Sequence, residues 1–69
     1  MPLCLRTWFG NVKVLETEGE TSSVSILDDL KKRCYSISLP KIHGLASTHL
    51  YLFFLTEENV LCFRIDAIM

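Results

Sequence analysis

The chain has 69 residues, of which 49% are hydrophobic and 22% are charged, and its formal net charge at pH 7 is -1. A chain this short cannot build two independent hydrophobic cores, so we expect residues 1–69 to form one small globular domain. The nearly balanced charge argues against nucleic acid as a partner, because nucleic-acid-binding domains usually present a basic surface.

The chain contains three cysteines, Cys4, Cys34 and Cys62, each within an apolar pattern. Their number is odd and no Cys-x-x-Cys spacing occurs, so we expect no disulfide framework and a reducing compartment, cytoplasmic or nuclear. We expect the three side chains to be buried or half-buried. Arg6 interrupts the opening apolar residues, which therefore do not form a signal peptide. The longest apolar run, Leu50–Leu55, is too short to span a bilayer, so we expect no membrane association.

Residues 1–16 predict a β-hairpin. Apolar and polar residues alternate over Leu3–Trp8, as in a strand with one buried face. The pair Gly10-Asn11 is typical of a tight hairpin turn. In the second strand Val12 and Val14 share one face, and Lys13 lies on the other.

After a polar loop over Glu16–Ser25, three signals predict a helix. Ser25 and Asp28 have the spacing of a capping box. Three residues recur at helical spacing and would form an apolar stripe: Leu27, Leu30 and Cys34. Acidic residues come first and the basic run 31–33 comes last, which is the order that the helix dipole favours.

The second half of the chain predicts two further strands. Pro40 prevents a continuation of the helix, and Ser36–Thr48 is interpreted as an irregular crossing. His49–Leu55 is a strongly apolar strand, Thr56–Asn59 a turn, and Val60–Ile65 the closing strand. In the closing strand we expect one face to carry Leu61, Phe63 and Ile65, and the other Cys62 and Arg64.

The opening of the chain resembles a ubiquitin-like domain. The order and spacing of that family's first strand and turn are matched by Met1, Leu3, Leu5, Arg6, Thr7 and Gly10. Leu27–Cys34 resembles its first helix, Leu39-Pro40 its proline-containing segment, and Glu58–Phe63 its last strand. The resemblance implies an α+β fold of the β-grasp type, a ubiquitin-like roll in the order ββαββ. One helix would pack on a four-stranded mixed sheet in which the first and last strands pair in parallel. Where that family has an extra strand and a helical turn, this chain has only Thr56 and Glu57, so the implied domain is trimmed between its third and last main strands.

The resemblance also implies a function, that of a non-conjugated ubiquitin-like protein-interaction module. The chain ends Asp66-Ala67-Ile68-Met69 and lacks the Gly-Gly tail of conjugated modifiers. The implied partners are proteins, such as those of the ubiquitin–proteasome pathway, and they would bind the open face of the sheet. If Leu3, Leu5, Leu61 and Phe63 face the helix, the partner-binding residues on the open face are Arg6, Trp8, Phe9, Cys62 and Arg64.

Trp8 is the main candidate among these residues. A rigid aromatic side chain beside a turn is typical of interface anchors. Trp8 also stands where ubiquitin-like domains carry an apolar contact residue, two positions before the turn glycine. The alternative is that Trp8 folds over the end of a small core, since large aromatic residues are highly buried on average.

A second hypothesis is that the chain is a truncated or spliced fragment. It would then self-associate, or pair with a parent protein, through an exposed strand edge. The apolar run Leu50–Leu55 motivates this reading, and we expect a monomer or weak self-association.

The residues do not predict an enzyme, a cofactor or a metal site. The cysteines and the two histidines, His43 and His49, form no pattern that would activate a nucleophile. Their spacing does not match zinc sites, and the three glycines are isolated rather than grouped in a phosphate loop.

Overall fold

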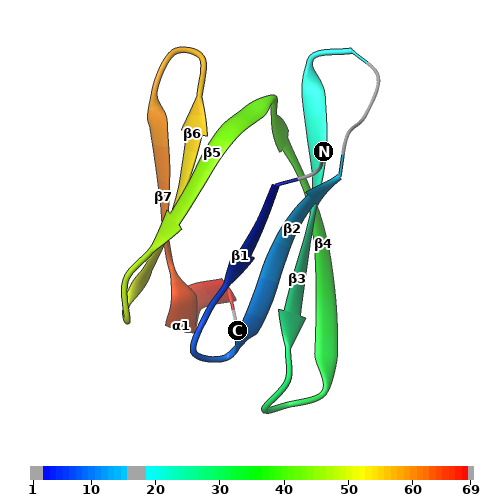
Figure 1. Cartoon of the computed structure of the whole chain (residues 1–69), viewed down its shortest axis with the longest axis vertical. Helices are drawn as coiled ribbons and strands as arrows, with labels where there is room; N and C mark the ends of the chain where they lie inside the picture. The colour runs from blue at the N-terminus through cyan, green and yellow to red at the C-terminus, as the bar shows by residue number, and fades with distance from the viewer. Residues whose placement is uncertain (1–2, 16–18, 69) are drawn as a thin grey trace.

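The computed structural model describes residues 3–15 and 19–68, in which seven strands form two antiparallel sheets (Figure 1). The first sheet has the order β1 (Leu3–Arg6), β2 (Gly10–Leu15), β3 (Thr21–Asp28) and β4 (Arg33–Pro40). The second sheet has the order β5 (Ile42–Ser47), β6 (Tyr51–Thr56) and β7 (Val60–Arg64). A four-residue helix, α1 (Ile65–Ile68), follows the last strand.

The predicted β-grasp fold is wrong. Each strand pairs only with its neighbours along the chain, and every pairing in the described residues is antiparallel. β1 and β7 belong to different sheets, so the expected parallel pair of first and last strands does not form. No helix covers a four-stranded mixed sheet, because the helix of the described chain is the short α1. It is not long and apolar enough to cross a membrane.

The helix predicted to start at Ser25 is replaced by the end of β3, a turn and the start of β4. Buried residues alternate along β3, in the order Ser22, Val24, Ile26 and Asp28. This period of two is that of a strand, and β-branched side chains favour it. Asp28 does not form a capping box: its Oδ1 accepts hydrogen bonds from the backbone N–H groups of Leu30 (3.0 Å) and Lys31 (3.1 Å) and so closes the β3–β4 turn.

The irregular crossing predicted over Ser36–Thr48 is also wrong, because most of it lies in β4 and β5. Pro40 is the last residue of β4, an edge strand, where a missing N–H group is tolerated. Beyond it the buried Ser22 hydroxyl accepts a hydrogen bond from the N–H group of Ile42 (3.1 Å). This bond joins the first sheet to the start of the second.

The two predicted hairpins are confirmed with small shifts. The predicted turn at Gly10-Asn11 is wrong, because both residues belong to β2 and Asn11 pairs with Arg6. The turn lies between Arg6 and Gly10, where the N–H group of Thr7 donates to the carbonyl oxygen of Gly10 (2.9 Å). The parts of the predicted first strand and polar loop at residues 1–2 and 16–18 lie outside the described residues; Thr21 onward belongs to β3. The second hairpin is β6 and β7, and the predicted alternation of faces along β7 is confirmed.

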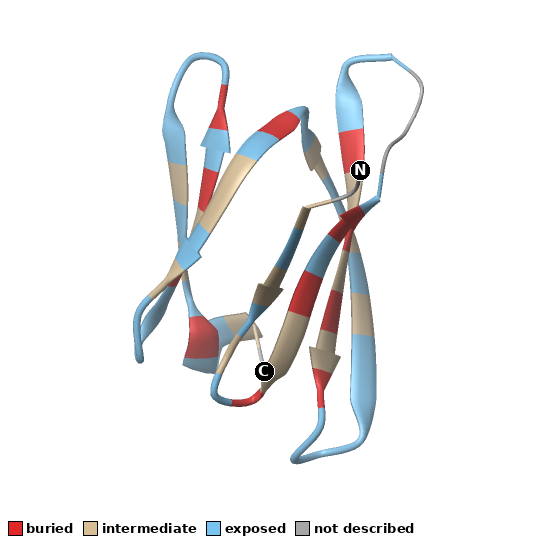
Figure 2. Cartoon of the chain, viewed as in Figure 1, coloured by how far each residue is buried: buried red, intermediate tan, exposed pale blue. Residues whose placement is uncertain are grey.

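The core lies between the two sheets, each of which turns one apolar face toward the other (Figure 2). The buried hydrophobic residues come from both sheets, the first turn and α1: Phe9, Val12, Val14, Val24, Ile26, Ile42, Leu52, Phe54 and Ile65. Leu3, Leu61 and Phe63, expected to face a helix, are half-buried and pack against this core instead. Burial of each apolar face by the other provides the main stabilisation.

Gly10 allows β2 and β3 to approach closely at the turn end of the sheet. A Cβ atom at this position would collide with the carbonyl oxygen of Leu27. A glycine is therefore required here for steric reasons.

We expect Gly10→Ala to destabilise the fold by about 1–3 kcal/mol, since the added methyl group must displace backbone. Chemical denaturation measures the change. Gly44→Ala is the matched control, because a Cβ there would lie 3.5 Å from the Leu55 side chain, an ordinary contact. Equal stability of the two variants would contradict the steric role of Gly10.

Candidate functional site

Three turns and the start of α1 meet at one end of the molecule, the lower end in Figure 1. Backbone hydrogen bonds connect them. The N–H group of Asp29 donates to Phe9 (2.8 Å), which joins the β3–β4 turn to the β1–β2 turn. The N–H group of Ile65 donates to Leu50 (2.9 Å), which joins α1 to the β5–β6 turn. Segments far apart in the sequence thus form one connected surface.

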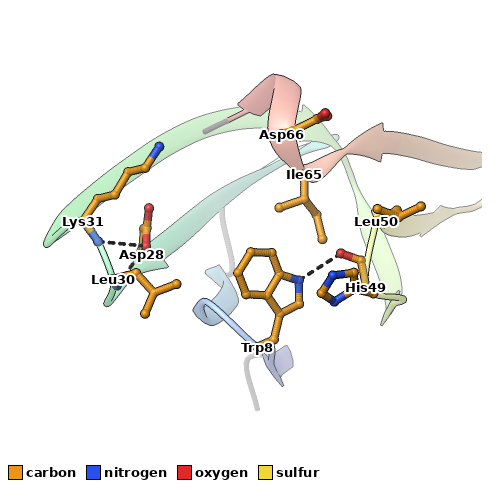
Figure 3. Close-up of a pocket in the computed structure, with 8 residues that line it drawn as sticks. All are labelled: Trp8, Asp28, Leu30, Lys31, His49, Leu50, Ile65 and Asp66. Carbon is orange, nitrogen blue, oxygen red and sulfur yellow. Dashed lines mark hydrogen bonds between the residues drawn. The ribbon is translucent and has the colours of Figure 1, made fainter.

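This surface contains a hollow of about 320 Å³, which we call the Trp8 hollow (Figure 3). Its lining residues come from all four segments: Trp8, Asp28, Leu30, Lys31, His49, Leu50, Ile65 and Asp66. The volume is at the lower end of the range of small-ligand pockets. Three large apolar side chains around it are exposed, Trp8 by 51%, Leu30 by 67% and Leu50 by 58%.

Trp8 is held in a defined position although half of its surface is exposed. Its indole Nε1 donates a hydrogen bond to the carbonyl oxygen of His49 (2.9 Å), and the two rings lie 5.2 Å apart. Phe9 supports it from the core, edge to face, with ring centroids 5.5 Å apart. In Figure 3 the side chain of Ile65 points toward the indole ring. An exposed but ordered indole loses little conformational entropy when a partner covers it.

Asp28 forms a polar wall of the hollow. Its side chain is fully buried, with 0% of the residue exposed. Oδ1 accepts the two turn hydrogen bonds, whereas Oδ2 accepts none from the part of the chain that the structure describes. In Figure 3 this second oxygen lies on the side of the carboxylate opposite the Leu30 side chain. Nearly all buried carboxylate oxygens have partners, so Oδ2 is an exception.

The five predicted partner-binding residues do not form one surface. Trp8 lines the hollow, and Phe9 is buried beneath it rather than available for contact. Arg6 is exposed on β1 of the first sheet, whereas Cys62 and Arg64 are exposed on β7 of the second. They were expected to share the open sheet face of a β-grasp fold, and the structure does not have that fold.

Arg64 still lies next to the hollow through its neighbour Asp66. Its Nε and Nη2 donate to the two carboxylate oxygens of Asp66, at 3.1 and 2.8 Å. Both side chains are more than half exposed, so this ion pair adds little stability. In this ion pair the positive charge of Arg64 lies next to the negative charge of Asp66.

The sequence patterns place the other lining residues in elements that differ from those of the structure. Leu30 was assigned to a helix core, His49 to a strand, and Asp28 to a helix cap, but all three lie at or beside turns. A large apolar residue within a turn, such as Leu30 or Leu50, is the one feature that could have indicated an exposed apolar site.

The three cysteines are exposed rather than buried. Cys4, Cys34 and Cys62 lie on three different strands and all are free and exposed, so their predicted burial is wrong. Each points outward because its strand neighbours face the core. Within residues 3–15 and 19–68, no three His, Cys, Asp or Glu side chains are grouped as a metal site would require.

No protein family model, curated protein or solved structure matches this chain. The ubiquitin-like assignment therefore stays a prediction drawn from short sequence motifs, and the β-grasp fold that it implied is wrong.

We expect all three thiols to react with Ellman's reagent in the native protein, because outward-facing cysteines are accessible. The measurement compares the number of reactive thiols per chain before and after addition of denaturant. A native count below the denatured count would contradict the exposed placement of at least one of them.

Proposed function

We propose that this chain is a protein-interaction module that binds a segment of a partner protein in the Trp8 hollow. The observation that carries the proposal is the cluster of exposed apolar side chains around the hollow: Trp8, Leu30 and Leu50. Isolated exposed apolar residues are common, but three large ones around one concave surface are typical of an interaction site.

The construction of this end supports the proposal. Binding residues occur preferentially on loops that a rigid scaffold positions, and here the loops are joined by hydrogen bonds above the core. Trp8 has the properties of an interface anchor, since it is large, ordered and half-exposed. The other half of the lining is polar, namely Asp28, Lys31, His49 and Asp66. Polar groups around an apolar centre give orientation and specificity.

The test uses short random peptides displayed on phage and selected against the unmodified chain. Selected peptides are then synthesised with a fluorescent label, and their affinity is measured by anisotropy. We expect Trp8→Ala to weaken binding by about 30-fold or more, the effect of removing an interface anchor, and Leu50→Ala to weaken it by a smaller factor.

Leu15→Ala is the matched control for Leu50→Ala, because Leu15 is 46% exposed on β2 and does not line the hollow. We expect this control to keep the full affinity. Thermal melts of all three variants establish that they remain folded. Peptides that bind Trp8→Ala as tightly as the unmodified chain would show that the hollow is not the binding site.

A second candidate function is self-association, or pairing with a parent protein, through a strand edge. The apolar run Leu50–Leu55 does not support this function, because Leu52 and Phe54 are buried and β6 is the central strand of its sheet. The strand that favours it is β4, an eight-residue edge strand without a fully buried residue. Between Arg33 and Pro40 this strand carries no charge, and charges are the usual protection of an exposed edge.

If β4 mediates association, Ser36→Lys should shift the chain toward the monomer, because it places a charge on the exposed face of the edge strand. Sedimentation equilibrium over a range of concentrations measures the shift. Ala67→Lys adds the same charge on α1, away from the strands, and should leave the association unchanged. A monomeric unmodified chain at the highest concentration would exclude this function.

A further inference from the structure

The carboxylate of Asp28 is not explained by an apolar binding site. A polar atom without a hydrogen-bond partner destabilises a folded protein, and an apolar residue would line the hollow without that cost. The closure of the turn accounts for Oδ1 but not for Oδ2. The second oxygen is therefore positioned to accept a hydrogen bond from a group outside the described chain.

We propose that the partner segment carries a basic residue, lysine or arginine, next to an apolar one. This inference rests on the proposed function and names the chemistry of the same site. The apolar side chain packs against Trp8 and Leu50, and the cationic group donates a hydrogen bond to Oδ2 of Asp28.

A cationic donor fits this position better than a neutral one. Hydrogen bonds between two charged groups are shorter and stronger than neutral ones, and burial strengthens them further. The exposed indole of Trp8 lies between the Asp28 side of the hollow and the Leu50 side (Figure 3). A lysine or arginine that crosses this ring also gains a cation–π contact.

The chain's own charges near the hollow do not replace this donor. Asp66 pairs with Arg64. Lys31 lines the hollow and donates its backbone N–H group to Oδ1, but it does not hydrogen-bond to Oδ2. Of the two lining carboxylates, Asp28 is thus the one with an oxygen that accepts no hydrogen bond from the described residues.

Oδ2 is covered in the unbound chain, so a partner reaches it only after a local rearrangement. Asp28 is completely covered, whereas Leu30, two residues later, is 67% exposed at the rim of the hollow. Figure 3 shows the Leu30 side chain beside Asp28. A partner reaches Oδ2 only if side chains around the carboxylate rotate, an adjustment that interfaces commonly make on binding.

The experiment is a double-mutant cycle between peptide and protein. Each selected peptide that depends on Trp8 is made in pairs, with its basic residue either kept as lysine or replaced by norleucine, which retains most of the apolar stem and lacks the charge. The protein variant is Asp28→Asn, which keeps an oxygen to close the turn and replaces the other with an amide nitrogen that cannot accept a hydrogen bond.

On the unmodified chain we expect the norleucine peptide to bind about 10-fold or more weakly than the lysine peptide. On Asp28→Asn the two peptides should bind within about twofold of each other. Asp29→Asn is the control, since it removes the same charge from the adjacent exposed position and should preserve the lysine preference. A lysine preference that survives in Asp28→Asn but is lost in Asp29→Asn or Asp66→Asn would overturn the assignment to Asp28.

The two proposals fail in different ways. If Trp8→Ala abolishes binding but lysine and norleucine peptides bind the unmodified chain equally, the hollow binds apolar segments and the basic residue is refuted. If no selected peptide depends on Trp8, the proposed function itself fails. The lysine-to-norleucine comparison needs no protein variant, so it decides the inference even where Asp28→Asn does not fold.

Discussion

The two sheets hold together because each has a single apolar face and each covers the apolar face of the other. Val12, Val24 and Ile26 of the first sheet and Phe54 of the second are completely buried, and this contact is the core of the molecule. In a chain of 69 residues there is little further apolar surface to bury. Polar side chains alternate outward along the same strands and keep the outer surfaces accessible to water.

The end of the molecule that carries the Trp8 hollow is held more firmly than a set of separate loops would be. Gly10 lets the first hairpin approach β3 closely, and the adjacent Phe9 both enters the core and accepts a hydrogen bond from the next turn. Trp8 is then fixed against His49 of the second sheet. The exposed aromatic side chain is thus attached to both sheets, which favours a defined binding surface over a flexible one.

Asp28 connects stability and recognition at this end. One of its oxygens closes the β3–β4 turn with two hydrogen bonds, which is a structural role. The other oxygen is buried without a partner among the described residues. This lowers the stability of the fold, and closure of the turn does not require it. Such costs concentrate at functional sites, where a group is positioned for a ligand rather than for the fold.

Sequence patterns were sufficient to predict those strands whose residues fit only one kind of secondary structure. The alternation around Val12 and along Leu61–Ile65 predicted two hairpins, because a period of two is that of a strand. The alternation also predicted the inward face of β7, whereas the inward face of β2, with Val12 and Val14, came from the structure. Trp8 was identified as a candidate contact residue, although its exposure and its neighbours were unknown.

The other elements depend on contacts between segments that are distant in the sequence. Between Val24 and Cys34 the residues fit both a helical spacing and a strand alternation, so local signals do not distinguish them. β3 forms because β2 and β4 pair with it on both sides, whereas a short helix would have needed a sheet surface to cover. The hollow depends on the same packing. Its residues come from three turns and a helix start that are distant in sequence, and only the contact between the two sheets brings them together.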